Sequence, residues 1–468
     1  MLFVEFRFAV FFAVAFLVHW ALRRNALRKA WLLACSYAFY AGWDWRFVGL
    51  IALSTLIDYL AGLCIYASRT QAARRRWVTI SLVANLGILG FFKYFGFFVD
   101  SATHFLLWLG LPTSQSSLEI ILPLGISFYT FQSLSYSIDV YRGRFEPTRN
   151  LLDFALYVGF FPQLVAGPIV RAASFLPQLR VVRRFEDVDV RAALVLFLIG
   201  FFKKTCVADN VAPFVDRVFE NPSAFDFAAQ WMAVLAYAAQ VYGDFSGYSD
   251  MAISCAALLG FKLSPNFRFP YLASNISDFW RRWHISLSTW LRDYLFFSLG
   301  GNRGTRARVG WNLMITMVLG GLWHGAGWNF VFWGFLHGIS LAVHRVWQYR
   351  TKAWRPWPPI LAWLGPLATF AFVAFSFVFF RASDVETGMA MARTLLFGGS
   401  TGELGPPPAL SAFVALLAAA HLTAAKFQGE RPWDRLPSLG FAALLGVASA
   451  LVLMLSPRES TPFIYFQF

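Results

Sequence analysis

Residues 321–330 read GLWHGAGWNF, which places His324 in an apolar run rich in glycine and tryptophan. The run lies between two basic clusters, one ending at Arg308 and the other beginning at His344. The intervening stretch of about 35 residues would make about 50 Å of helix at about 1.5 Å per residue. Because that length allows a helix to enter a membrane by about 25 Å and return, the sequence predicts a helical hairpin with His324 near its middle.

The composition of the whole chain is that of a polytopic membrane protein. Of its 468 residues, 58% are hydrophobic and only 14% are charged, which is far from the composition of a soluble domain. Apolar runs close to the ~20 residues that span a hydrocarbon core recur from end to end. We therefore predict an all-α integral membrane protein with about 10–13 transmembrane or re-entrant helices. A single membrane domain, 1–468, is expected.

The net charge of +15 does not indicate nucleic acid binding, because the basic residues form short clusters between apolar runs. Such clusters set membrane topology, so membrane lipids and not nucleic acid are the expected partners. The cluster RRNALRK (23–29) follows the first apolar run, which is the wrong order for a cleavable signal peptide and predicts an outside N-terminus. The four cysteines lie in or beside apolar segments without C-x-x-C spacing, so neither a disulfide framework nor a metal site is expected.

Five further segments carry specific structural expectations. Residues 30–67 are nearly all apolar around a central GWDW and predict two short spans joined by a tight turn. Residues from about 77 to 98 predict a single span. The segment 154–170 contains two prolines and predicts a re-entrant element that protein must bury. Polar residues at 112–117 and 348–358 predict loops.

Histidine is costly at membrane depth unless it faces a cavity or a partner, which makes His324 a functional candidate. The alternative is a structural histidine that donates one hydrogen bond inside a helix bundle, and position alone leaves both interpretations open. His337 and His344 lie on the return leg of the hairpin without an acidic partner, so metal binding is not expected there. Three other histidines are expected to be structural: His19, His104 and His421.

A second candidate region is residues 275–303, where charged and aromatic side chains are dense for so apolar a chain. One interpretation is an amphipathic interfacial helix whose arginines reach lipid phosphate. The other is a polar pocket at the mouth of a buried site, with His284 pointing inward while Arg281 and Arg282 point elsewhere. The candidate substrate-binding residues of this region and the hairpin are Trp283, Asp293, Trp323, Asn329, Arg281 and Arg282.

Four sequence motifs, taken together, are specific enough to suggest a family. They are GDFSGYSDMA (243–252), NISDFWRRWHISLSTWLRDY (275–294), LGGNR (299–303) and GGLWHGAGWNFVFWGFLHG (320–338). In this order they resemble the membrane-bound O-acyltransferase family, and within it the bacterial proteins that O-acetylate exported polysaccharides such as alginate. The resemblance spans essentially the whole chain, and its most characteristic core is at about 119–345. It implies a bundle of membrane helices around a buried catalytic funnel.

The resemblance implies an O-acyltransferase that takes an acetyl group from cytoplasmic acetyl-CoA, without a bound cofactor. The acetyl group would pass across the bacterial inner membrane to a hydroxyl of an exported polysaccharide, directly or through a periplasmic SGNH-type acetyltransferase partner. The two family histidines fall on His324 and His284, which the resemblance marks as catalytic. Phe297 and Ser298 depart from the alginate-type pattern before LGGNR, so the motifs indicate the family and do not single out alginate as the polymer.

The chemistry of acyl transfer suggests how these residues act. An alcohol is a poor nucleophile at neutral pH, and a neutral imidazole such as that of His324 can take its proton as it attacks the carbonyl. His284 is expected to orient the acceptor or to polarise the carbonyl, and the sequence does not choose between the two roles. Gly321, Gly325 and Gly327 allow close backbone approach, either to a ligand or to a neighbouring helix.

Two other interpretations are kept beside the acyltransferase. A transporter or flippase would use buried histidine and aspartate as proton-relay or gating groups. A non-catalytic scaffold would recruit periplasmic partners to a polymer-modifying complex. The lack of an inverted repeat and the two histidine motifs weigh against the transporter. For 243–252, a polar turn that opens a helix is favoured over a catalytic role for Asp244 or Asp250.

Overall fold

The structure is a computed structural model whose described part is helical. It describes residues 1–468 except for 114–117, 119, 165–166, 352–363, 458–460 and 465–468. Within the described residues, the β contact found is an isolated bridge between Phe225 and Leu404. The loops predicted at 112–117 and 348–358 fall largely outside the described residues. Two compact units make up the chain, and the predicted single membrane domain stays a prediction.

The first unit comprises residues 1–189 together with 255–264. Its α-helices are α1 (Phe6–Ala21), α2 (Asn25–Asp44), α3 (Val48–Ala67), α4 (Gln71–Leu89), α5 (Phe95–Trp108), α6 (Ile126–Tyr141), α7 (Leu151–Gly159), α8 (Phe161–Leu164) and α9 (Ala172–Arg180). The two apolar segments predicted within 30–67 are confirmed as the helices α2 and α3, although α2 begins earlier, at Asn25. That each of them crosses the membrane stays a prediction. The tight turn between them is η1 (Trp45–Phe47), where the Asp44 carboxylate accepts the Arg46 backbone N–H at 3.0 Å.

The predicted single span at about 77–98 is longer in the structure. Helix α4 begins after Thr70, whose hydroxyl accepts the Ala73 N–H at 3.2 Å. Helical structure then continues through the π-helical turns of η2 (Gly90–Tyr94) into α5. It ends near Gly110, whose φ of 75° lies in the left-handed region where a helix is commonly capped. The sequence placed the core of this span correctly and missed both ends.

The proline-containing segment 154–170 forms short, interrupted helices. Helix α7 begins after Asn150, whose side chain accepts the Leu152 N–H at 3.0 Å, and α8 follows directly after Phe160. Phe154, Phe160 and Phe161 are fully buried. Burial by protein is what irregular backbone requires at membrane depth, so the local prediction agrees with the structure, whereas re-entry into the membrane stays a prediction.

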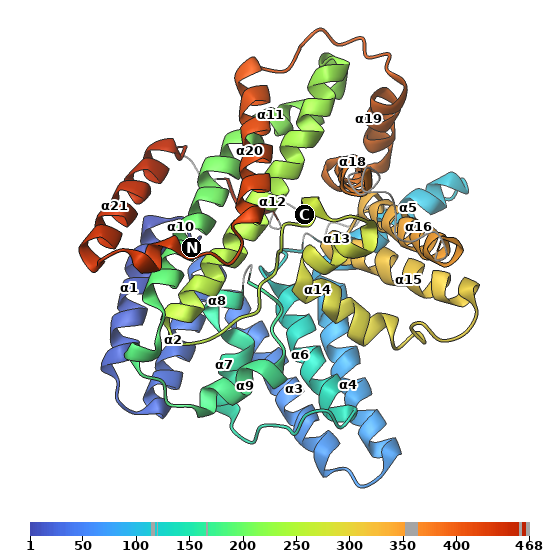
Figure 1. The fold of residues 1–468 in the computed structure, drawn as a ribbon. Helices are drawn as coiled ribbons and strands as arrows, with labels where there is room; N and C mark the ends of the chain where they lie inside the picture. Colours follow the sequence, from blue (N-terminus) through green and yellow to red (C-terminus); the bar gives the residue numbers. More distant parts are fainter. Residues whose placement is uncertain (114–117, 119, 165–166, 352–363, 458–460, 465–468) are drawn as a thin grey trace. The chain divides into compact units, whose positions relative to one another are not determined.

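The second unit comprises residues 190–254 and 265–468. Its α-helices are α10 (Val190–Phe202), α11 (Asp209–Glu220), most of α12 (Phe227–Leu258), α13 (Ile276–Arg282), α14 (Ile285–Trp290), α15 (Arg306–His324), α16 (Trp328–Arg350), α18 (Leu364–Arg381), α19 (Val385–Phe397), α20 (Pro408–Lys426) and α21 (Ser438–Leu455). Two π-helical segments, η4 (Lys203–Ala208) and η7 (Leu291–Phe296), continue α10 and α14. Figure 1 shows these elements in chain order from green to red.

The hairpin predicted between the two basic clusters is confirmed as α15 and α16, which lie side by side in Figure 1. His324 is the last residue of α15. A methyl group at Gly321 would lie 2.2 Å from the Phe330 carbonyl oxygen, and one at Gly334 would lie 2.4 Å from that of Met317. Since a side chain would not fit between such close backbones, helix packing accounts for Gly321.

The motif at 243–252 does not open a helix, so the predicted polar turn is wrong. The motif lies inside α12, which runs without interruption from Phe227 to Leu258. Its two glycines face the preceding helical segment: a methyl group would lie 2.8 Å from the Lys203 carbonyl oxygen at Gly243 and 2.6 Å from that of Gly200 at Gly247. Close helix packing therefore explains glycines that resemble turn residues in the sequence.

The all-α membrane class is confirmed. Among the described residues, five stretches are long and apolar enough to cross a membrane: Asn25–Ala67, Gln71–Trp108, Leu364–Arg381, Pro408–Lys426 and Ser438–Leu455. Helices α15 and α16 are not among these stretches, although together they carry the glycine-rich histidine motif. The predicted total of about 10–13 transmembrane or re-entrant helices and the buried funnel stay predictions.

Candidate functional site

His324 occupies the closed end of the α15–α16 hairpin and is 3% exposed. Its ring lies among aromatic side chains, with centroids 5.2 Å from Trp333 and 5.3 Å from Phe380, both nearly edge-on. The turn that follows is tight, because a methyl group at Gly325 would lie 2.1 Å from the Phe330 ring. The hairpin thus holds the imidazole in a mostly apolar wall and fixes where it lies.

His284 lies at a break between two short helices. It separates α13 from α14, and its backbone has φ 41° and ψ 56° in the left-handed region. This conformation is uncommon for a residue other than glycine and must be held by its surroundings, as often happens at functional sites. His284 is fully buried. The predicted amphipathic helix through 275–303 is therefore interrupted at the residue of greatest chemical interest.

Asn266 holds the chain next to His284 in this conformation. Its backbone carbonyl accepts the Ile285 N–H at 2.9 Å, and its side-chain oxygen accepts the Ser286 N–H at 3.1 Å and the Ser286 hydroxyl at 2.9 Å. On the other side of the break, the Arg268 N–H donates to the Arg282 carbonyl at 2.9 Å. These hydrogen bonds from a neighbouring segment fix the strained turn, so the position of His284 depends on tertiary structure.

The fold brings the two predicted catalytic histidines together. Their ring centroids lie 6.4 Å apart although 40 positions separate them in the sequence. Trp323 adjoins both, at 5.9 Å from His284 and 5.1 Å from His324. Phe245 of α12 packs edge-on against His284 at 4.6 Å. The two imidazoles and the indole therefore form a shared, buried group of rings.

The other candidate residues have more varied surroundings. Trp283 is buried in an aromatic cluster and stacks on Phe279 with centroids 5.6 Å apart. Asn329 is also buried, and its amide nitrogen donates to the Ala382 carbonyl at 2.9 Å, which links the start of α16 to the end of α18. Trp323 is therefore the predicted lining residue that lies directly against both histidines.

The charged candidates lie towards the protein surface. Arg281 is exposed, while Arg282 is half-buried and pairs with Asp278 at 3.0 Å. Asp293 pairs with Arg292 at 2.7 Å. The positions of these residues agree with the expectation that His284 points inward while the neighbouring arginines point elsewhere. The two local ion pairs explain the charges of Arg282 and Asp293 without a ligand.

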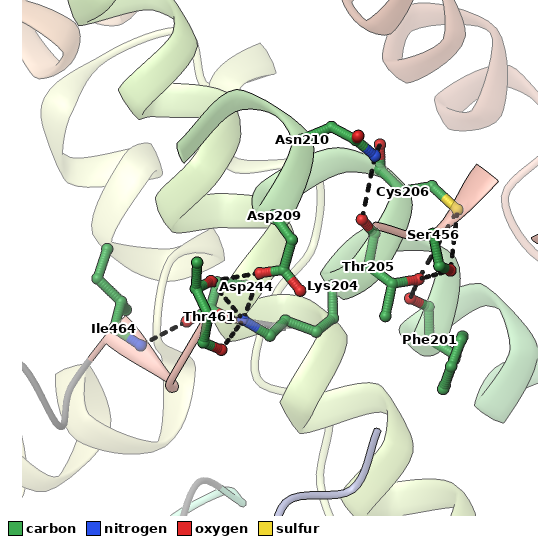
Figure 2. Close-up of polar contacts among 10 residues, drawn as sticks. All are labelled: Phe201, Lys204, Thr205, Cys206, Asp209, Asn210, Asp244, Ser456, Thr461 and Ile464. Atoms are coloured by element: carbon green, nitrogen blue, oxygen red, sulfur yellow. Dashed lines mark hydrogen bonds and ion pairs between the residues drawn. The ribbon is translucent and has the colours of Figure 1, made fainter. Parts of the chain in front are cut away.

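The sequence analysis missed a buried ionic cluster, which Figure 2 shows. Lys204 of η4 is fully buried and lies 2.7 Å from the Asp209 carboxylate and 2.7 Å from that of Asp244. The chain near its C-terminus completes the cluster. Lys204 donates to the Thr461 carbonyl at 2.9 Å, the Ile464 N–H donates to Asp244 at 2.7 Å, and the Thr461 hydroxyl donates to Asp209.

The ionic cluster gives Asp244 a structural partner. With two buried carboxylates around one buried ammonium group, each charge depends on the others for compensation. Asp250, the other acid of the same motif, pairs with Lys203 at 2.7 Å in a less buried position. The sequence signal was the pair Lys203 and Lys204 at the end of the apolar stretch 194–202, which is a costly place for charge.

Comparison with known proteins gives a consistent assignment. The model of MBOAT, the membrane-bound O-acyltransferase family, matches residues 148–383, which include both histidines. The chain is 40% identical to "Probable alginate O-acetylase AlgI" of Azotobacter vinelandii over 98% of this chain and 99% of that protein. It is 39% identical to "Peptidoglycan O-acetyltransferase" of Helicobacter pylori over 82% of this chain and 78% of that protein. "Teichoic acid D-alanyltransferase" of Streptococcus thermophilus is 28% identical over 52% and 61%.

Proposed function

Because the chain belongs to the membrane-bound O-acyltransferase family and is an acyltransferase, we propose that it moves an acetyl group from cytoplasmic acetyl-CoA towards an exported polysaccharide. Relatives that match most of the chain are named for O-acetylation of alginate and of peptidoglycan. Their names support acetyl as the acyl group and a cell-surface polymer such as alginate as the acceptor. The proposed location is the bacterial inner membrane, which separates such a donor from such an acceptor.

The observation that carries the proposal is the buried pair formed by His284 and His324. Their ring centroids are 6.4 Å apart, and both side chains are at most 3% exposed. Two imidazoles at this separation can act on one reacting group from two sides. A structural histidine needs only a hydrogen-bond partner. Here the backbone of His284 is strained and His324 ends a helix, and both features place the two rings next to each other.

In the proposed reaction, His324 acts as the general base. The acceptor hydroxyl oxygen attacks the thioester carbonyl carbon as its proton passes to an imidazole nitrogen of His324. The C–S bond then breaks, and the sulfur leaves with a proton returned by the imidazolium, so that the products are an acetyl ester and free CoA. His284 would orient the acceptor or donate a hydrogen bond to the carbonyl oxygen as negative charge develops on it.

The exposed Arg281, near the end of α13, is the residue we propose for donor binding. Arg281 is exposed and lies three residues before His284 in the sequence. A guanidinium group can bind phosphate oxygens with two parallel hydrogen bonds, so Arg281 would contact the phosphates of CoA. Arg282, already paired with Asp278, would contribute less.

The acetyl group would reach the polymer either directly or through a periplasmic acetyltransferase partner of the SGNH type. Both routes start from the same step at His324, the release of CoA from acetyl-CoA. A partner changes only which hydroxyl takes the acetyl group. The two routes are therefore distinguished by supplying the polymer alone or the polymer together with the partner.

The test is release of free CoA by the purified protein in nanodiscs, with acetyl-CoA, a polysaccharide acceptor and a candidate partner supplied. His324→Ala is expected to lower the rate by about 10²–10⁴-fold, the usual contribution of a general base. His104→Ala is the matched control, because His104 is an exposed histidine on α5. A His324→Ala protein that folds and retains the wild-type rate would reject the proposal and reopen the transporter and scaffold interpretations.

A further inference from the structure

Next to the histidine pair lies a second group of polar rings, formed by the buried Trp333 and His337 and the half-buried Trp280. The ring centroids are 4.5 Å apart for Trp333 and His337, 5.2 Å for Trp280 and His337, and 5.8 Å for Trp280 and Trp333. Trp333 also contacts His324, at 5.2 Å. The group is therefore separated from the proposed base by a single indole ring.

The hydrogen bonds of Ser376 determine which nitrogen of His337 carries the proton. The Ser376 hydroxyl donates to the Val373 carbonyl at 2.7 Å, so its hydrogen is already used. We assign the hydroxyl hydrogen to Val373, so that His337 Nε2, 3.0 Å from the same hydroxyl oxygen, is the donor to Ser376. The neutral imidazole then carries its hydrogen on Nε2, which leaves Nδ1 with a lone pair and makes it an acceptor.

Three polar atoms of this group have no hydrogen-bond partner among the described residues. They are Nδ1 of His337, Nε1 of Trp280 and Nε1 of Trp333. His337 is fully buried and Trp333 is 1% exposed, so bulk solvent does not serve these atoms. A buried polar atom left without a partner costs stability, and native structures seldom keep several together unless a ligand or water satisfies them.

We infer that Trp280, Trp333 and His337 form a ligand subsite next to His324, which binds a neutral hydroxyl or amide group of a substrate. A hydroxyl has one hydrogen to donate and two lone pairs to accept, which matches one acceptor nitrogen and two indole N–H donors. An amide supplies an acceptor and a donor in the same way. A carboxylate or phosphate cannot donate to Nδ1, and an ammonium group cannot accept from the indoles.

The subsite deepens the proposed function and rests on it for the identity of its ligand. Two substrates of that reaction carry the required chemistry. The pantetheine arm of the donor has amide groups, and the polysaccharide acceptor has hydroxyl groups. S-acetylpantetheine and an unacetylated alginate oligosaccharide represent the two sources separately.

The experiment measures the Kd of each probe by calorimetry with the full-length protein in nanodiscs. Trp333→Phe keeps an aromatic ring and removes one donor. His337→Gln keeps a group that can donate to Ser376 and removes the acceptor at Nδ1. Each variant is expected to raise the Kd of one probe by about three- to tenfold, the effect of one neutral hydrogen bond, while the Kd of the other probe stays unchanged. The affected probe identifies the source.

Trp231→Phe is the matched control, because the Trp231 indole already donates to the Leu395 carbonyl at 3.2 Å and should not affect either Kd. Trp280→Phe gives a second donor variant if Trp333→Phe does not fold. Folded variants that bind both probes with the wild-type Kd would overturn the inference, as would a wild-type protein that binds neither probe. Binding can be measured without turnover. If the wild-type protein releases no CoA but Trp333→Phe and His337→Gln still raise the Kd of a probe, the proposed reaction is rejected and the subsite is supported.

Discussion

Two buried polar groups in the second unit use opposite means to keep polar side chains inside the protein. The ionic cluster surrounds Lys204 with Asp209 and Asp244, so that opposite charges and hydrogen bonds compensate one another. The histidine pair lies among aromatic rings, with Phe245 against His284 and Trp333 against His324. Ion pairs compensate the charges of the first group within the protein, whereas ring packing surrounds the imidazoles of the second.

One helix contributes to both groups from adjacent positions. Asp244 of α12 binds Lys204 and the N–H of Ile464, and Phe245 packs against His284. Phe463, next to Ile464, is fully buried and lies 5.7 Å from the Phe245 ring. We propose that the ionic cluster serves folding and that the histidine pair serves the reaction. Variants in the two groups should therefore change different measured properties.

The largest expected effect on stability is that of Lys204→Met. Removal of the ammonium group would leave two buried carboxylates without their partner, and breaking a buried pair from one side costs about 3–5 kcal/mol. Denaturant or thermal unfolding in detergent measures the free energy of unfolding. Lys203→Met is the control, because the Lys203–Asp250 pair is partly exposed (26% and 20%) and should cost about 1 kcal/mol or less. Equal losses would contradict the assignment of the ionic cluster to folding.

A smaller effect is expected at the helix contact that places His324. Gly334→Ala would put a methyl group 2.4 Å from the Met317 carbonyl oxygen, and such overpacking costs about 1–3 kcal/mol. The α15–α16 hairpin would have to shift, so the rate of CoA release should fall as well. Gly310→Ala is the matched change in α15, since its nearest neighbour would be Ala342 at 3.9 Å.

Gly310→Ala should raise the free energy of unfolding by about 0.5–1 kcal/mol, because alanine favours a helix interior over glycine. If the free energy of unfolding falls in Gly334→Ala and rises in Gly310→Ala, close helix packing is the reason for glycine at position 334. A Gly334→Ala protein as stable and active as the wild type would show that the hairpin does not depend on this close approach.

The smallest effect is expected for an exposed carboxylate outside both groups. Asp384 caps α19 by accepting the Thr387 N–H at 2.8 Å, and this hydrogen bond together with that of Ser383 lowers the pKa of Asp384. Asp384→Ala should cost about 1 kcal/mol at neutral pH. Because the pKa is lower in the folded state, the stabilisation is present above the ordinary carboxyl pKa and is lost as pH falls through the lowered value.

The pH dependence provides the measurement for Asp384. The difference in unfolding free energy between Asp384→Ala and the wild type should shrink in acid. Asp384→Asn keeps an acceptor that does not titrate, so its own stability should lack this acid-dependent loss. A difference that stays constant from neutral to acid pH would show that the charge of Asp384 adds nothing to the cap.

Local sequence signals predicted much of the fold. The distance between Arg308 and His344 gave the α15–α16 hairpin and the place of His324 within it, because helix length follows directly from residue number. GWDW correctly marked the turn between α2 and α3. The family motifs selected His284 and His324, and the structure places their rings near each other.

Features that depend on contacts between distant segments were not predictable. The left-handed backbone of His284 is held by Asn266, and the partners of Lys204 include residues of the chain after α21. The glycines and serines of 243–252 are typical of a turn in the sequence. In the structure the Lys203 backbone lies so close to α12 that a side chain at Gly243 would not fit. Local composition cannot distinguish a glycine that turns the chain from one that admits a neighbouring helix.

The measurement that tests the central claim most directly is a double-mutant cycle of CoA release at His284 and His324. His324→Gln, His284→Asn and the double variant are compared with the wild type, and asparagine suits the left-handed backbone at position 284. If both imidazoles act in one step, each single variant lowers the rate and the double variant is little slower than His324→Gln alone. Losses that multiply fully, or a wild-type rate in His284→Asn, would contradict a shared catalytic site.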